Sequence, residues 1–230
     1  LFEILTCAYL KYSEEYKENI TLIEAGLFHQ IDSTNVFKKN LASIVGTIGL
    51  DHLQWIKNKT IEGIIHEKTV KLLNSKIFIN KQDSIQIMSK IESALNKNQS
   101  QKYFFGKDFN ISIAENSFIQ YEDSEGLIVL PEPNVLGDHQ ISNIGTSIAV
   151  TKKLFNVKDH DIKNGITKIE LKGRLQEIKL GKLKKLVGSN RIICDGGHNI
   201  NSSKAIAEWV KQQNQDVHII IGMMKDKDHQ

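Results

Sequence analysis

The residues best suited to chemistry lie in the segment Thr47–His52, where an apolar run ends in an acid and an imidazole. The run from Ala42 to Leu50 has the composition of a buried strand, and Asp51 and His52 follow it directly. In parallel α/β sheets, ligands bind at the carboxyl ends of the strands. A carboxylate and a histidine at that position could coordinate a metal or contact a phosphate, so this segment is the first candidate site.

Glu24 is a second polar residue that follows a short apolar run, Ile20–Ile23, which predicts another buried strand. If the two strands are neighbours, Glu24 and His52 could face one another across the sheet edge. Mg²⁺ prefers oxygen ligands and usually takes one or two carboxylates plus substrate phosphates, which suits Glu24 better than His52. A shared metal and a hydrogen-bonded structural pair both remain open on spacing alone.

Lys68 lies beside Glu67 on a helix that is expected to begin after an N-cap at Thr60. Burial favours the neutral amine of a lysine, and a neutral amine can add carbon dioxide to become an anionic carbamate. Spacing alone favours the simpler interpretation, in which the aliphatic stem packs on apolar surface and the ammonium group reaches solvent.

The loop Asp195-Gly196-Gly197-His198-Asn199 precedes a predicted helix and could bind a ligand. Its glycines would let the backbone approach a ligand closely, and the helix would offer free N–H groups to a phosphate. Asp195 could contact a ribose hydroxyl or a metal, and His198 a phosphate oxygen; a plain tight turn is the alternative. A further segment, Gly222–Asp228, could be a second ligand loop or a solvated run of charges.

The elements that must position these residues alternate between strand and helix. Strands at Lys76–Asn80 and helices at 60–68 and Asp83–Leu95 indicate βαβ units and a mainly parallel sheet. The pattern changes to an antiparallel meander from Tyr103 to Leu130, including a strand at 117–121. Further segments complete the prediction: helices at 2–16, 139–155, 159–169 and 202–212, and strands at 191–194 and 217–221. The fold class is therefore α/β, with a central domain at 1–171 and the start of a second domain at 172–230.

The composition excludes several classes of protein. The chain has 230 residues, a net charge of +3 and two cysteines, Cys7 and Cys194, without metal-ligand spacing. These values indicate a reducing, cytoplasmic compartment and give no sign of nucleic-acid or membrane partners. No apolar run approaches the roughly 20 residues of a membrane span. The N-terminus has no signal-peptide pattern, and its first residue, Leu1, suggests either an unusual start or a piece of something longer.

Taken in order, these motifs resemble folylpolyglutamate synthase and dihydrofolate synthase, within the Mur-type ATP-dependent amide ligases. Ile23-Glu24-Ala25-Gly26-Leu27 with Asp32-Ser33-Thr34-Asn35 resembles the family's Glu-Val-Gly-Leu-Gly-Gly-Arg-Leu-Asp-Ala-Thr-Asn. The other matching segments are Phe2-Glu3-x-x-Thr6, Ile48–His52, Glu67-Lys68, Gly137-x-His139-Gln140-x-x-Asn143, Gly173-Arg174, Asp195–Asn199 and Asp226-Lys227-Asp228. The resemblance covers nearly the whole chain and implies a Mur-ligase-like central domain followed by the beginning of a Rossmann-like C-terminal domain.

The resemblance also implies roles for individual residues. Glu24 and His52 correspond to Mg²⁺ ligands, Lys68 to a carbamylated catalytic lysine, and Phe2 and Thr6 to the folate side. Asn143, Arg174, Asp195 and His198 correspond to nucleotide contacts, with His198 also catalytic. The implied reaction is phosphorylation of a folate or pteroate carboxylate by ATP, followed by attack of the glutamate amine on the acyl phosphate.

The chain departs from the family pattern in its phosphate-binding residues. Scanning all 230 residues finds no G-x-x-x-x-G-K-[ST] run, and the family's glycine-rich phosphate loop would precede Leu1. Phe28-His29-Gln30 stands where the family has Gly-Gly-Arg, and Thr69-Val70 stands where it has Ala-Gly. We therefore expect truncation at both ends and carry three hypotheses: a ligase that is either a fragment or completed by a second polypeptide, a degenerate remnant, or a non-catalytic nucleotide-binding module.

Overall fold

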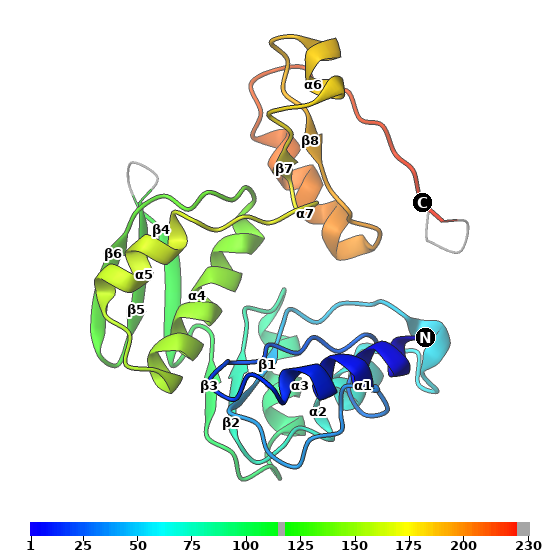
Figure 1. Cartoon of the computed structure of the whole chain (residues 1–230), viewed down its shortest axis with the longest axis vertical. Coiled ribbons are helices and arrows are strands. Elements are labelled where there is room, and N and C mark those ends of the chain that lie inside the picture. The colour runs from blue at the N-terminus through cyan, green and yellow to red at the C-terminus, as the bar shows by residue number, and fades with distance from the viewer. Residues whose placement is uncertain (115–117, 225–230) are drawn as a thin grey trace. The chain divides into compact units, whose positions relative to one another are not determined.

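The chain divides into two compact units, Leu1–Tyr103 and Phe104–Gln230, in a computed structural model that describes residues 1–114 and 118–224 (Figure 1). We call them the N-terminal unit and the C-terminal unit and describe each by itself. The domain boundary expected near residue 172 stays a prediction.

The N-terminal unit is a parallel α/β arrangement. Its sheet has the order β1-β2-β3, and β1 pairs with β2 in parallel register from Ala42↔Lys76 to Val45↔Ile79. The elements in chain order are α1 (Phe2–Ser13), β1 (Ala42–Val45), the 3₁₀ helix η1 (Leu53–Trp55), α2 (Ile61–Thr69), β2 (Lys76–Ile79), α3 (Ile85–Ala94) and β3 (Lys102–Phe104). The expected parallel α/β class is confirmed.

The core of this unit forms around β2, whose residues Ile77, Phe78 and Ile79 are fully buried. An apolar run of this kind is typical of a parallel strand covered on both faces. Helices α2 and α3 contact one another and add further buried isoleucines. Each begins at a side-chain cap: Thr60 Oγ1 accepts the Gly63 N–H at 3.2 Å, and Ser84 Oγ accepts the Ile87 N–H at 3.2 Å.

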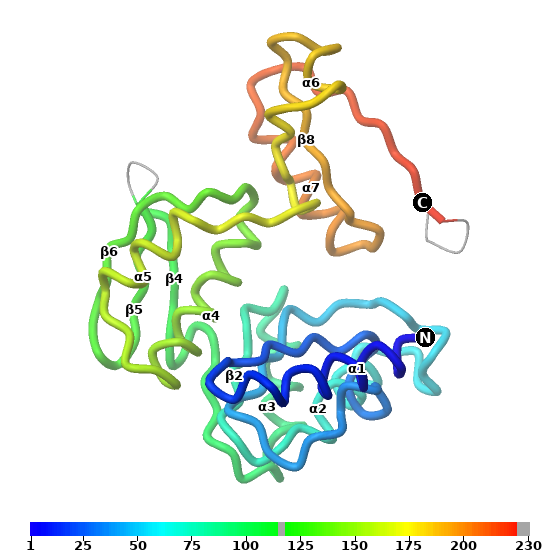
Figure 2. The backbone as a smooth tube through the Cα atoms, in the orientation of Figure 1, coloured from blue at the N-terminus to red at the C-terminus, as the bar shows by residue number. Residues whose placement is uncertain are grey.

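Two strand predictions in this unit need correction. Ile20–Ile23 is not a strand: the chain between α1 and β1 contains no regular element (Figure 2), and Leu22 is 87% exposed. An apolar run becomes a strand only where a neighbouring strand pairs with it, and no such pairing is present here within residues 1–114. β1 ends at Val45 and not at Leu50, so Asp51 lies in the connection after the strand.

Helix α1 has no buried residue, although its apolar positions have helical spacing. Leu1, Ile4 and Leu5 are all more than half exposed. None of the helices in the two described ranges is both long enough and apolar enough to cross a membrane.

The C-terminal unit begins with the expected antiparallel meander, in the order β4-β5-β6. Residue Ser117 of the predicted strand 117–121 lies outside the described residues. The elements in chain order are β4 (Phe109–Ile113), β5 (Ile119–Asp123), β6 (Gly126–Leu130), α4 (Asp138–Leu154), α5 (Asp159–Ile166), β7 (Gln176–Glu177), α6 (Lys182–Val187), β8 (Ile193–Cys194) and α7 (Ile200–Lys211).

Helix α4 packs against β4 (Figure 1), and a buried ion pair joins it to β5. Gly145 allows the close approach, because a Cβ at this position would lie 2.6 Å from Ile111 Cγ2. The Lys152 Nζ lies 2.9 Å from Asp123 Oδ2, and the two side chains are only 9% and 1% exposed. The Lys152 Nζ also lies 5.4 Å from the Tyr121 ring centroid.

The prediction of a βαβ repeat over 191–221 is wrong for the described residues. β8 pairs with β7 in antiparallel fashion over two residues, and no strand is present at Val217–Ile221, where Ile220 is fully exposed. Helix α7 forms as predicted, whereas the short basic helix α6 was not expected. The segment Asp226-Lys227-Asp228 lies outside the described residues.

Candidate functional site

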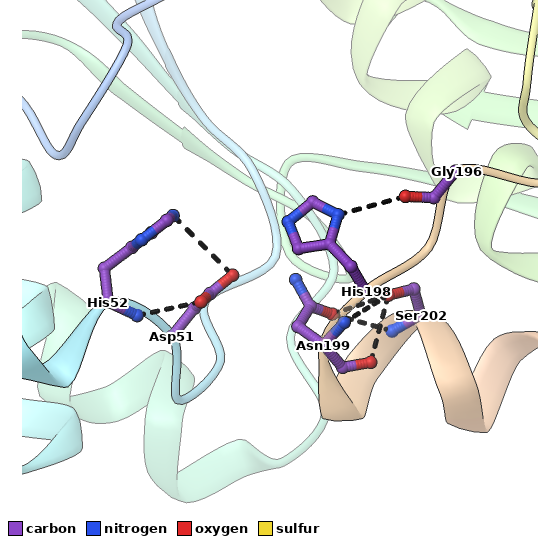
Figure 3. A network of polar contacts seen from close by, with 6 residues as sticks. All are labelled: Asp51, His52, Gly196, His198, Asn199 and Ser202. Atoms are coloured by element: carbon purple, nitrogen blue, oxygen red, sulfur yellow. Dashed lines mark hydrogen bonds and ion pairs between the residues drawn. The ribbon is translucent and has the colours of Figure 1, made fainter. Parts of the chain in front are cut away.

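Asp51 and His52 form a local pair at the start of η1. Asp51 Oδ1 accepts the His52 backbone N–H at 2.8 Å, and Asp51 Oδ2 lies 3.8 Å from His52 Nε2 (Figure 3). His52 has a left-handed backbone with φ of 55°, a region where non-glycine residues are uncommon. The His52 ring stays about one-third exposed, so its nitrogen atoms are accessible to a ligand.

Lys68 lies in the last turn of α2 and is half-buried. Burial penalises its ammonium form and lowers the pKa of Lys68, while the carboxylate of Asp51 opposes that shift. The Lys68 Nζ also lies over the ring of Phe28, 5.9 Å from its centroid. Lys68 is therefore half-buried with its amine over an aromatic ring, and both interpretations of its role stay predictions.

The loop from Leu27 to Thr34, which we call the Phe28 loop, is held in place by the carboxylate of Asp32. Asp32 Oδ2 accepts the Leu27 N–H at 2.8 Å, and Asp32 Oδ1 accepts the Thr34 N–H at 2.9 Å and its hydroxyl at 2.5 Å. Burial alone would raise the pKa of Asp32, but these hydrogen bonds hold it below its usual value. The Gln30 N–H donates to the Glu67 carbonyl at 3.2 Å and joins the loop to α2.

The Phe28 loop is the feature of the candidate site that sequence reasoning missed. The substitution of glycine by Phe28 was visible in the sequence, but its contact with Lys68 and His52 was not, because it depends on the loop's path. The adjacent His29 Nε2 is buried and has no hydrogen-bond partner among the residues that the structure describes.

The structure brings Phe2 and Thr6 to this same loop, whereas Glu24 has no polar partner within residues 1–114. Thr6 Oγ1 lies 3.4 Å from Ser33 Oγ, and a Cβ at Gly26 would lie 2.8 Å from the Phe2 ring. Glu24 is exposed and makes no hydrogen bond or ion pair within residues 1–114. The described parts of the chain contain no cluster of three or more His, Cys, Asp or Glu side chains able to hold a metal.

In the C-terminal unit, Asp195 connects two turns. Its Oδ2 accepts the Leu175 N–H at 2.7 Å, and its Oδ1 accepts the Gly197 N–H at 2.6 Å. The Gly196 N–H donates to the Gly173 carbonyl at 2.8 Å, so the Gly173–Leu175 turn and the 195–199 loop lie against one another. Arg174 lies in the first of these two turns, and its side chain is exposed. This geometry matches the tight-turn alternative for Asp195.

The same loop leads directly into α7. Asn199 Oδ1 accepts the Ser202 N–H at 2.9 Å, which caps the helix, and His198 Nδ1 lies 3.0 Å from the Gly196 carbonyl (Figure 3). His198, Ser203, Lys204 and Met223 are among the residues that line a cavity of about 290 Å³ beside the helix start. The ammonium group of Lys204 could neutralise an anionic ligand in this cavity, and an imidazole N–H could donate a hydrogen bond to it.

The residues at the start of α4 form a polar chain. Asn143 Nδ2 donates to Gln140 Oε1 at 3.0 Å, and Gln140 Nε2 lies 2.9 Å from His139 Nε2. An amide nitrogen can only donate, so the Nε2 of His139 accepts and the ring is neutral in this arrangement. Burial lowers the pKa of His139; the Asp195 carboxylate opposes this shift and Arg174 adds to it.

Comparisons with known proteins support a ligase-like fold, although no family model matches the chain. The chain is 23% identical to a probable dihydrofolate synthetase of Schizosaccharomyces pombe, over 99% of this chain and 54% of the relative. It is 24% identical to a dihydrofolate synthase/folylpolyglutamate synthase of Bacillus subtilis, over 100% of this chain and 54% of the relative. The chain thus spans about half the length of the curated relatives it matches.

Solved structures show the same fold. A point mutant of L. casei FPGS matches with a TM-score of 0.79 at 22% identity, over 97% of this chain and 55% of that protein. An FPGS complex with AMPPCP and folate matches with a TM-score of 0.79 at 21% identity, over 94% of this chain and 53% of that one. The mixed α/β fold and the resemblance to folylpolyglutamate and dihydrofolate synthases are therefore confirmed over nearly the whole chain.

Proposed function

We propose that this chain is part of an ATP-dependent ligase that adds glutamate to a folate or pteroate carboxylate. The observation that carries the proposal is the match of nearly the whole chain, in sequence and in fold, to folylpolyglutamate and dihydrofolate synthases. The reaction would begin with transfer of the terminal phosphoryl group of ATP to the acceptor carboxylate. The glutamate amine would then attack the acyl phosphate and release phosphate, which leaves an amide bond.

In the N-terminal unit, Glu24 and His52 are the proposed magnesium ligands. The Glu24 carboxylate suits the ion, which prefers oxygen ligands, and it is exposed without a polar partner within residues 1–114. The His52 nitrogen is a less usual ligand, and its ring is partly exposed. Water and substrate phosphates would complete the coordination, as is usual for Mg²⁺. Magnesium would offset the charge on the phosphates. Lys68 would be the catalytic residue at the end of α2. Phe2 and Thr6 would contact the folate or pteroate acceptor.

In the C-terminal unit, Asn143, Arg174, Asp195 and His198 are the proposed nucleotide-contacting residues. Arg174 is exposed and always charged, so it can contact a phosphate without first breaking an internal bond. The role proposed for Asp195 is to fix the turn that presents Arg174, since both of its oxygens accept backbone N–H groups. We further propose a central domain at 1–171 and a second domain from 172.

A non-catalytic nucleotide-binding module is the second candidate. It is favoured by the bulky Phe28, which stands where the resemblance implies a glycine.

The test is turnover by the purified chain with MgATP, glutamate and either dihydropteroate or tetrahydrofolate. Mass spectrometry would detect a product heavier by one glutamyl unit. We expect product when a polypeptide carrying a glycine-rich phosphate loop is added, and we expect Glu24→Ala or His52→Ala to abolish it. If no product forms under either condition, the ligase proposal fails.

Nucleotide binding separates the two candidates. Arg174→Ala should weaken ATP binding measured by calorimetry, while Arg191→Ala provides a matched control. Arg191 is also exposed, but it makes a surface ion pair with Glu177 at 3.2 Å that is worth at most about 1 kcal/mol. Binding that is sensitive to Arg174 but not accompanied by turnover would support the module; equal effects of the two variants would contradict a nucleotide role for Arg174.

A further inference from the structure

The backbone of Phe28 has a conformation that costs free energy, and the position of its ring depends on that conformation. Its φ is 54°, in the left-handed region, where a bulky side chain is a true outlier. The conformation is maintained by the Asp32 hydrogen bond to the Leu27 N–H at 2.8 Å and by the Gln30–Glu67 backbone bond at 3.2 Å. These contacts lie on both sides of Phe28 and bring its ring to the end of α2.

The Phe28 ring lies between two groups of the proposed site. The Lys68 Nζ is over the ring face, 5.9 Å from the centroid. The His52 ring meets the Phe28 ring in an edge-to-face arrangement, with centroids 6.2 Å apart and an interplanar angle of 84°. Phe28 is therefore the one aromatic ring that the described residues place over the Lys68 amine.

The face of an aromatic ring carries partial negative charge. It attracts an ammonium group placed over it, with a strength that depends on how far the cation is desolvated. The same face repels an anion at that position. A carbamate at Lys68 would exchange the positive charge above the ring for a negative one, so the ring favours one form of the lysine over the other.

We propose that Phe28 is a positioning residue that holds Lys68 as an ammonium ion and disfavours its carbamate. This inference rests on the proposed function only for the role of the site in the reaction. The chemical form of Lys68 can be measured without turnover. Carbamate formation needs a neutral amine: its nitrogen attacks the carbon of CO₂, one C=O electron pair moves to oxygen, and a proton leaves the nitrogen for water.

This assignment distinguishes the chain from the pattern implied by its resemblance. With glycine at position 28, no ring would cover the amine, and carbamate formation would meet no repulsion from that side. Burial favours the neutral amine of Lys68, whereas the ring of Phe28 and the Asp51 carboxylate both oppose this effect and favour the ammonium ion. The charge of the proposed site is then set by a residue that does not itself titrate.

The test is the uptake of ¹³C-labelled CO₂ at Lys68 in the 230-residue chain, without ATP, glutamate or folate. The carbamate would be trapped by alkylation and located by peptide mass spectrometry, with Lys68→Arg as the blank. Phe28→Leu keeps a bulky apolar side chain but lacks the ring, and Phe28→Tyr keeps the ring. We expect uptake by Phe28→Leu to exceed that of the wild type several-fold, up to roughly tenfold, and uptake by Phe28→Tyr to match the wild type.

Phe28→Gly separates the ring from the backbone strain. It should also show increased uptake, and circular dichroism spectra that match the wild type would exclude unfolding as the cause. Equal uptake by the wild type, Phe28→Leu and Phe28→Tyr, whether high or absent in all three, would overturn the proposal. Because no substrate is present, that result would leave the ligase proposal untouched, and a failed turnover assay would likewise leave this test valid.

Discussion

Replacing Lys152 by methionine should destabilise the C-terminal unit strongly, because it leaves a buried carboxylate without its cation. Removing one partner of a buried ion pair typically costs about 3–5 kcal/mol. Asp123 would keep the Tyr121 hydroxyl at 3.0 Å and the Glu125 N–H at 2.8 Å. We therefore expect a loss near the lower limit, about 3 kcal/mol, or roughly 10 °C in Tm.

The neighbouring lysine provides a matched control on the same helix. Lys153 Nζ pairs with Glu125 Oε1 at 2.6 Å, but the Glu125 side chain is 53% exposed. Lys153→Met should therefore cost no more than about 1 kcal/mol. Urea unfolding followed by far-UV circular dichroism would compare the two variants. Equal destabilisation by the two lysine variants would refute the reasoning.

The ion pair also predicts a pH dependence with a definite sign. Burial alone would raise the pKa of Asp123, but the hydrogen bond from Lys152 and the backbone N–H of Glu125 hold it below its usual value. A lowered pKa contributes stability above the unfolded value of about 4, and that stability is lost as the pH falls through the folded pKa. The difference between wild type and Lys152→Met should therefore shrink in acid; a constant difference would contradict the pairing.

Two further predictions concern close packing and the Phe28 loop. Gly145→Ala would place a Cβ 2.6 Å from Ile111 Cγ2 and should lower the free energy of unfolding, measured in urea, by about 1–3 kcal/mol. Gly165→Ala, with no atom within 4 Å of the added Cβ, should be neutral or slightly stabilising. The reverse order of the two variants would contradict the packing. Asp32→Asn should lower stability at neutral pH and flatten its pH dependence in acid, because the pKa of Asp32 is held down by Thr34 and the backbone; an unchanged acid profile would show that Asp32 is not responsible.

Elements with a strong internal pattern were predictable from the sequence. Helix α4 and the β4–β6 meander formed within a few residues of their predicted bounds, because apolar spacing and turn residues agree there. The failures were the runs Ile20–Ile23 and Val217–Ile221. Their apolar composition suits a strand, but strand formation depends on a pairing partner elsewhere in the chain. Sequence periodicity carries no information about that partner.

The candidate site was predictable to a smaller extent. Residue types pointed to Asp51, His52 and Lys68, and the structure places Asp51 close enough to Lys68 to affect its pKa. The ring of Phe28 over Lys68 could not be predicted, since it depends on a left-handed backbone and on the backbone N–H groups that donate to Asp32. The metal and nucleotide roles themselves stay predictions.

The weak packing of residues 176–224 has a thermodynamic consequence for ligand binding. None of these residues is buried, and the β7–β8 ladder is two residues long, so little apolar burial opposes local opening of this stretch. A ligand that contacts the 195–199 loop must restrict these conformations as it binds, which reduces the observed affinity. By the same linkage, the bound ligand becomes a principal source of order in this part of the chain.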